Sequence, residues 1–206
     1  MAAPIGTHLL PQTAEINADS GRLVVGGVDM CTLAEEFGTP VFVYDEHHLR
    51  KRCQEAVWTF GPGVAYASKA FLCAAMARLA DEEGMHLDVA SAGEAYVALR
   101  AGVKPERLTF HGNNKSTAEL TYALEHGFGR IVIDSLDELE RLRRIANFGH
   151  QRPKVLLRLT PGVEAHSHEF ISTGHEDVKF GFSIRHVPPY SVGTTVGLPH
   201  GAGRTV

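Results

Sequence analysis

Several features that identify large classes of protein are missing from this sequence. The 206 residues carry a formal net charge of −4, so the composition offers no basic surface for nucleic acid or for an anionic membrane. The longest apolar runs fall well short of a bilayer span. Residues Met1–Gln12 have no positively charged stretch followed by an apolar one, so we do not expect a secretion signal.

Cysteine is scarce, and common nucleotide-binding and catalytic motifs are absent. The cysteines Cys31, Cys53 and Cys73 form no CxxC pair, which favours reduced thiols in the cytoplasm over a disulfide framework or a zinc site. No GxGxxG motif follows a predicted strand, and neither a Walker-type phosphate loop nor a GxSxG motif occurs. His166 and His168 have no third ligand at a metal-binding spacing, so we expect no metal site.

The sequence does contain a regular alternation of short apolar runs and amphipathic stretches, and 44% of its residues are hydrophobic. The predicted strands are Val64–Lys69, His86–Ser91, Arg107–Gly112, Arg130–Ser135 and Lys154–Thr160, and the predicted helices are Leu72–Glu83, Gly93–Gly102, Thr117–His126 and Leu136–Phe148. Ser116 with Glu119, and Ser135 with Glu138, have the spacing of capping boxes. This alternation predicts parallel βαβ units and therefore an α/β fold.

The two ends of the chain differ from this central part. Near the N-terminus we expect strands at Gly21–Asp29 and Val41–Asp45, and helices at Cys31–Gly38 and His47–Phe60. A long polar loop follows the last strand. Residues Arg185–Val206 have no acidic residue and no helical or strand period, so they are expected to be irregular.

Polar residues gather where the predicted parallel strands end, which is one edge of a sheet or barrel; they are Lys69, Asp88, Ser91, His111, Asp134 and Arg158. A lysine at such a strand end can act as a Schiff-base nucleophile when its charge is desolvated. The alternative is a lysine that ends a strand and faces water. Asp88 can tune the charge of Lys69 or of a bound ring, or it forms a structural ion pair. The turn HGNNK (His111–Lys115) can meet an anion, or simply provides turn residues.

Taken together, these segments resemble the diaminopimelate decarboxylases, which belong to the fold-type III, alanine-racemase-like class of pyridoxal-phosphate enzymes. The matching segments are GTPVFVYDE (Gly38–Glu46), YASKAF (Tyr66–Phe71), LDVASAGE (Leu87–Glu94), HGNNKS (His111–Ser116), VIDSLDELERL (Val132–Leu142) and the stretch from RLTPG to KFGFS (Arg158–Ser183). YASKA alone indicates only the wider class, whereas YASKA followed by HGNNK, HxHxFIST and KFG is specific.

The resemblance implies a fold and a domain division. It implies an α/β chain that forms about five of the eight strands of a (β/α)8 TIM barrel, with N-terminal strands that belong to a second, β-sheet domain. Residues 1–45 would contribute to that β-domain, and residues 46–184 would form the N-terminal part of the cofactor-binding barrel. Residues 185–206 would be an irregular tail, native or non-native.

The resemblance also implies a chemistry. Lys69 would hold pyridoxal 5'-phosphate covalently, Asp88, Glu94 and Arg158 would line the cofactor pocket, and His111 would lie near the cofactor ring. The implied reaction converts the amino acid meso-2,6-diaminopimelate to L-lysine and carbon dioxide, in the cytoplasm, in a homodimer whose active sites lie at the subunit interface.

The sequence departs from the family after KFG. Neither the family's GLHxHxGS motif nor its later phosphate-binding glycine loop is found, so we expect a chain truncated after the fifth barrel strand, with little activity on its own. One alternative function is a related decarboxylase of ornithine or arginine. Another is an inactive fragment that binds the cofactor weakly.

Overall fold

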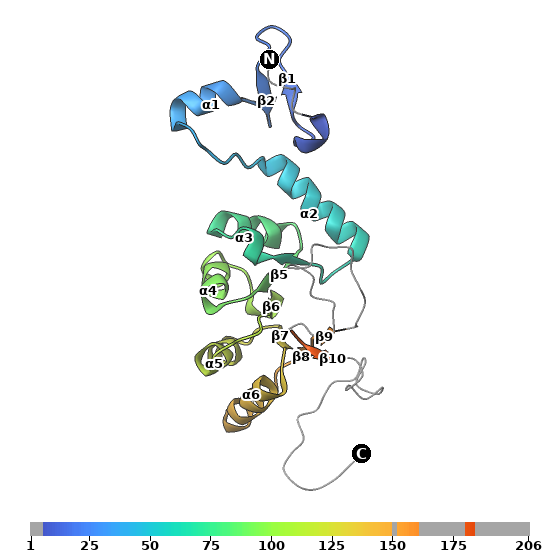
Figure 1. Cartoon of the computed structure of the whole chain (residues 1–206), viewed down its shortest axis with the longest axis vertical. Helices are drawn as coiled ribbons and strands as arrows, with labels where there is room; N and C mark the ends of the chain where they lie inside the picture. The colour runs from blue at the N-terminus through green and yellow to red at the C-terminus, as the bar shows by residue number, and fades with distance from the viewer. Residues whose placement is uncertain (1–5, 150–151, 161–179, 184–206) are drawn as a thin grey trace. The chain divides into compact units, whose positions relative to one another are not determined.

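The computed structural model describes residues 6–149, 152–160 and 180–183, and the chain divides into two compact units (Figure 1). One unit comprises Met1–Val64 with Glu82–Met85, and the other comprises Ala65–Asp81 with His86–Val206. This division reflects compactness alone, so the domain boundaries that the resemblance implies stay predictions.

The first unit opens with a 3-10 turn, η1 (Thr7–Leu9), and a small antiparallel sheet of β1 (Glu15–Ile16), β2 (Leu23–Val25) and β3 (Val28–Asp29), in that order. Gly26 and Gly27 connect β2 to β3 with φ angles of 58° and 82°. Glycine adopts this left-handed conformation without strain, and a two-residue hairpin turn requires it. The strand with a glycine break that is predicted over Gly21–Asp29 is therefore a hairpin.

Both helices predicted near the N-terminus are present. Helix α1 (Met30–Phe37) begins at Asp29, whose carboxylate accepts hydrogen bonds from the backbone N–H groups of Cys31 and Thr32. Helix α2 (Glu46–Phe60) begins in the same way at Asp45, which accepts from the N–H of His48. These carboxylates satisfy N–H groups that have no partner within the helix.

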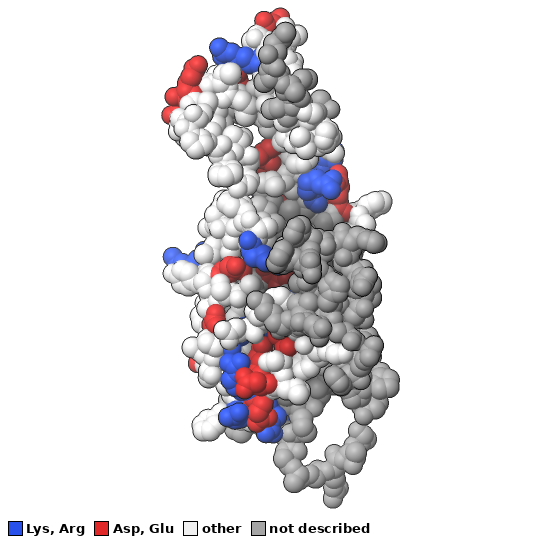
Figure 2. All heavy atoms as spheres, in the orientation of Figure 1, with Lys and Arg blue, Asp and Glu red and all other residues white. Residues whose placement is uncertain are grey.

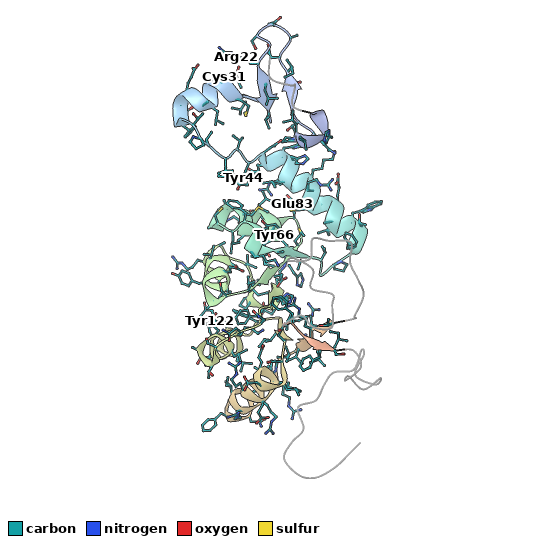
Figure 3. The ribbon with its side chains drawn as sticks, viewed as in Figure 1. Arg22, Cys31, Tyr44, Tyr66, Glu83 and Tyr122 are labelled. Carbon is teal, nitrogen blue, oxygen red and sulfur yellow. The ribbon has the colours of Figure 1, made fainter. Side chains whose placement is uncertain are left out.

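Helix α2 is also held by ion pairs within this unit. The guanidinium group of Arg50 lies 2.8 Å from the carboxylate of Glu82 and 2.7 Å from that of Glu83, which is labelled in Figure 3. Pairing with Arg50 holds the pKa of Glu83 below its usual range. Partly exposed pairs of this kind contribute little individually, and their main effect is to fix one end of α2.

Residues Val41–Asp45 do not form a strand, although their apolar pattern predicts one. A strand needs a neighbour for its backbone N–H and C=O groups, and this segment pairs with no strand in the described part of the chain. The side chain of Phe42 is 90% exposed. The prediction was wrong because an apolar pattern identifies residues that can form a strand, but it does not identify the strand with which they would pair.

The second unit is built on a parallel sheet of β4 (Ala65–Ala67), β5 (His86–Val89), β6 (Leu108–Phe110), β7 (Arg130–Ile133) and β8 (Val155–Leu157), in chain order. Helices α3 (Ala74–Glu82), α4 (Ala92–Arg100), α5 (Thr117–His126) and α6 (Leu136–Phe148) alternate with these strands and follow one another along one side of the sheet (Figure 1). Short 3-10 turns, η2 (Ser68–Ala70) and η3 (Pro105–Arg107), follow β4 and precede β6, and β9 (Leu159–Thr160) pairs in parallel with β10 (Phe182–Ser183). The predicted α/β fold and partial barrel are confirmed.

The two faces of this sheet differ in character, because successive side chains of a strand point to opposite faces. The pairing places Leu87 opposite Tyr66 and Leu108, and Asp88 opposite Ala67 and Thr109. The face against the helices is fully buried and apolar; it carries Leu87, Val89, Leu108, Phe110, Ile131 and Ile133. Burial of each such side chain contributes about 1.5–3 kcal/mol, so this face forms the core. The opposite face carries the polar residues.

The charged side chains of the described residues are mixed in sign on the face that Figure 2 draws. Figure 2 shows basic and acidic side chains interspersed on the face in view, with no patch of one sign. No helix in the described ranges combines the length and the apolar character needed to cross a membrane.

Candidate active site

Lys69 lies in η2, directly after β4, rather than in the strand itself. The hydroxyl group of Tyr66, labelled in Figure 3, donates a hydrogen bond of 2.7 Å to the carbonyl oxygen of Phe71, and so closes the turn that carries Lys69. The Lys69 side chain is exposed, and it makes no hydrogen bond or ion pair with any residue in the ranges described above. The structure therefore holds the backbone of Lys69 in place and leaves its amine accessible.

His111 and Asp88 come together beside this turn. His111 follows β6 by one residue, its backbone N–H donates to Val89, and its Nδ1 lies 3.2 Å from an oxygen of Asp88. The second ring nitrogen, Nε2, and the second Asp88 oxygen, Oδ1, are buried, and neither has a hydrogen-bond partner among the described residues. Buried polar atoms normally have partners, so these two are available to a bound molecule.

Arg158 pairs with Asp134 at the ends of β8 and β7. Its Nη1 lies 3.0 Å from Asp134 Oδ1, and the Asp134 side chain is only 2% exposed. The guanidinium carbon lies 4.4 Å from the ring centre of Phe180, and the Arg158 carbonyl accepts from the N–H of Phe182. Arg158 is thus fixed from both sides. Sequence reasoning noted Asp134 as a strand-end residue but did not place it in the site.

A steric requirement explains why the KFG motif has a glycine at its third position. Gly181 has a φ of 75°, and a Cβ atom there would lie 2.7 Å from the carbonyl oxygen of Arg158. A larger residue would push this segment away from the strand end that holds Arg158.

Glu94 performs a local task at the start of α4. Its carboxylate accepts a hydrogen bond of 2.7 Å from the N–H of Ala90, and its own N–H donates to the hydroxyl of Ser91. This closes the turn between β5 and α4, two residues after Asp88. The predicted place of Glu94 in a cofactor pocket stays a prediction.

One of the two predicted capping boxes is complete and the other is not. Ser116 accepts from the N–H of Glu119, and the Glu119 carboxylate accepts from the N–H of Ser116. Ser135 caps α6 in the same way, but the carboxylate of Glu138 instead forms an ion pair with Lys115, at 2.7 Å. Local spacing identified the caps but missed this long-range pair.

Glu119 gives a testable pH dependence. Burial acts to raise its pKa, but hydrogen bonds from the backbone and hydroxyl of Ser116 and from the backbone of Ala92 outweigh this and hold the pKa below its usual range. Such a carboxylate stabilises the fold above its unfolded pKa, about 4.3, and that stabilisation is lost as the pH falls further. We expect Glu119→Ala to lower the free energy of unfolding by about 1–2 kcal/mol at pH 7. The difference should shrink in acid. Urea denaturation measures both values, and Glu125→Ala, an exposed change on the same helix, should have no comparable effect.

The arrangement suits a carbonyl compound with acidic groups. An accessible amine lies at the same strand edge as a carboxylate–imidazole pair and a fixed arginine, as in barrel enzymes that build their sites at this edge. Among the described residues, no three His, Cys, Asp or Glu side chains lie together as a metal site would need. His166 and His168 lie outside the described residues.

Comparison with known proteins identifies the family of this chain. Residues 46–192 match the family described as pyridoxal-dependent decarboxylase, pyridoxal binding domain. The chain belongs to this family. The matched range contains Lys69, Asp88, Glu94, His111 and Arg158, and the family's description agrees with the predicted cofactor.

Individual relatives give a more specific likeness than the family model does. The chain is 52% identical over 182 residues to the diaminopimelate decarboxylase of Mycobacterium tuberculosis and 54% identical over 168 residues to that of Mycobacterium leprae. These matches cover 86% and 81% of this chain but 41% and 36% of the relatives, so the chain spans about two fifths of their length. The solved diaminopimelate decarboxylase of M. jannaschii aligns with a TM-score of 0.74 and 31% identity, over 85% of this chain and 42% of its own.

The residues of this chain fit pyridoxal phosphate in part. Lys69 offers an amine for the aldehyde, and the buried Nε2 of His111 and Oδ1 of Asp88 offer polar atoms that lack partners among the described residues. These groups fit the ring and the aldehyde.

Proposed function

We propose that this chain is the pyridoxal-phosphate-binding part of a diaminopimelate decarboxylase, with Lys69 as the residue that carries the cofactor. The proposal rests on one observation: the turn holds the backbone of Lys69 at the strand edge with its amine accessible, and at the same edge His111 and Asp88 keep two unpartnered buried atoms. The likeness to diaminopimelate decarboxylases at 52–54% identity supports the same function.

The residues would divide the work between them. Asp88 orients the His111 ring through Nδ1, which leaves Nε2 directed to a ligand near the cofactor ring. Arg158, oriented by Asp134, and Glu94 complete the lining of the pocket. The cofactor, when bound, supplies an electron sink for the pair of electrons left by the departing carboxylate. The protein's task is to hold the reacting groups in position and to bind and move protons at Lys69.

The proposed substrate is meso-2,6-diaminopimelate, converted to L-lysine and carbon dioxide in lysine biosynthesis. One solved structure of the M. jannaschii diaminopimelate decarboxylase is a co-complex with L-lysine; this chain aligns with it at a TM-score of 0.73 and 33% identity. Ornithine or arginine is a second candidate. The lysine/ornithine decarboxylase of Vibrio vulnificus supports it less, at a TM-score of 0.55 and 26% identity.

The organisation of the whole protein is part of the proposal. We expect residues 1–45 to contribute to a β-domain and residues 46–184 to the barrel; the tail predicted over residues 185–206 lies outside the described residues. We also expect a cytoplasmic homodimer with its active sites at the subunit interface, and little turnover by this chain alone.

A comparison of substrates tests the function. Residues 1–183 of this chain, joined to the C-terminal part of the M. tuberculosis relative, should release carbon dioxide from meso-diaminopimelate. We expect a preference in kcat/KM of about 10⁴-fold over L-ornithine and L-arginine, because a site built for the second carboxylate and amine is left unpaired by an analogue that lacks one of them. Equal turnover of ornithine would contradict the proposed substrate. The unextended chain, measured in parallel, should be nearly inactive.

A further inference from the structure

Lys115 and Glu138 form an ion pair deep inside the second unit. Lys115 Nζ lies 2.7 Å from Glu138 Oε1, and each side chain is only 1% exposed. Lys115 comes from the turn after β6, and Glu138 from the first turn of α6. Two buried charges lose hydration that their attraction only partly returns, so such a pair is weak evidence for stability. Its geometry is the more informative property.

The lysine holds the backbone that follows His111. Lys115 Nζ donates a hydrogen bond of 2.5 Å to the carbonyl oxygen of Gly112. Gly112 has a φ of 113°, and a Cβ atom there would lie 3.2 Å from the carbonyl oxygen of Ala90, in the turn after Asp88. The turn after β6 therefore packs closely against the turn after β5. The buried Lys115 side chain holds the turn after β6 in this position through its hydrogen bond to Gly112.

The glutamate connects this turn to the end of β7. Burial raises the pKa of Glu138, whereas the Lys115 ammonium acts to lower it. Glu138 lies in the first turn of α6, where its N–H donates to the hydroxyl of Ser135, and Ser135 directly follows Asp134. The side chain of Asp134 in turn binds Arg158. One buried pair thus links the backbone next to His111 with the backbone that carries the partner of Arg158.

We propose that the buried Lys115–Glu138 pair positions the candidate site, by holding the strand end of His111 at a fixed place against Asp88 and against the end of β7. The pair does not touch the ligand; it acts through His111 and Asp134. This inference rests on the proposed function only where cofactor binding is concerned.

A double variant removes the polar link with little loss of packing. Lys115→Met with Glu138→Leu replaces the pair by apolar side chains of similar size, a change that buried ion pairs often tolerate. The matched control is Asp81→Leu with Arg107→Met, which removes an ion pair of 3.0 Å near the opposite end of the strands. Two quantities are measured on the full 206-residue chain: the dissociation constant of pyridoxal phosphate, and the ¹⁵N signals of the His111 ring without cofactor, assigned with His111→Gln.

The inference expects a rise in the dissociation constant on the order of tenfold in the double variant, the size typical of groups that orient a ligand-binding residue from behind. The control pair should leave this constant nearly unchanged. The His111 ring signals should shift in the double variant and stay in place in the control. Unchanged signals and affinity in a folded double variant would overturn the inference.

Different results would contradict the proposed function and the proposed role of the Lys115–Glu138 pair. If the wild-type chain does not bind pyridoxal phosphate, the proposed function is contradicted, while the His111 signals still decide whether the buried pair positions the ring. If the double variant does not fold, Glu138→Gln, which keeps the shape of the side chain, is measured in the same way, and unchanged His111 signals in it would again overturn the inference.

Discussion

Replacing Lys69 by alanine is expected to abolish covalent attachment of pyridoxal phosphate. The wild-type chain, treated with the cofactor and then with borohydride, should retain a pyridoxyl group on the peptide that contains Lys69. Alanine has no amine, so the label on this peptide should vanish, and turnover in the extended protein should fall to background. Peptide mass mapping measures the label, and circular dichroism checks that the variant folds. Lys69 is exposed, so the substitution should cost little stability.

The control for this experiment is another exposed lysine. Lys104 lies before η3, near the opposite end of the strands from Lys69, so Lys104→Ala should leave the labelling of Lys69 unchanged. Equal labelling of Lys69 and Lys104 in the wild-type chain would indicate reaction with any accessible amine. That result, or a label absent from Lys69, would remove the basis of the proposed function.

The sequence predicted the second unit well because its signals are local. Helices α5 and α6 have the bounds that the pattern predicts, since Ser116 and Ser135 mark their first turns and each cap depends on residues three apart. The observed strands are shorter than the predicted ones. In β4, backbone pairing ends at Ala67, two residues before the predicted end at Lys69. The strand predicted at Val41–Asp45 failed because its partner cannot be identified from local sequence.

The candidate site was predicted in part for the same reason. The rule that parallel strands end at one edge brought His111 and Asp88 together correctly. The same rule could not predict the ion pair between Lys115 and Glu138, which lie 23 residues apart in the chain. Local sequence does not distinguish a buried lysine from an exposed one. A residue at the spacing of a local cap can thus bind a distant partner instead.

Gly129→Ala is expected to unfold the second unit or to destabilise it by about 4 kcal/mol or more. Gly129 lies directly before β7, and its N–H donates to the carbonyl oxygen of Pro105. A Cβ atom there would lie 2.0 Å from the carbonyl oxygen of Glu106 and 3.2 Å from that of Leu108. Both are backbone atoms of the segment that forms η3 and β6, so no side-chain rotation relieves the contact. Urea denaturation followed by circular dichroism measures the loss.

A matched glycine separates this steric effect from the general effect of adding a methyl group. Gly93, in the first turn of α4, has only the Ser91 hydroxyl within 4 Å of an added Cβ atom, at 3.8 Å. Gly93→Ala should therefore be neutral or stabilising by up to about 1 kcal/mol. The contrast also bears on function, because β6 and β7 carry His111 and Asp134 at their far ends. If Gly129→Ala separates these strands, labelling of Lys69 should fall with it, whereas Gly93→Ala should keep both the fold and the label. A folded, fully labelled Gly129→Ala chain would show that the close approach of β7 to the segment before β6 is not needed to hold the site.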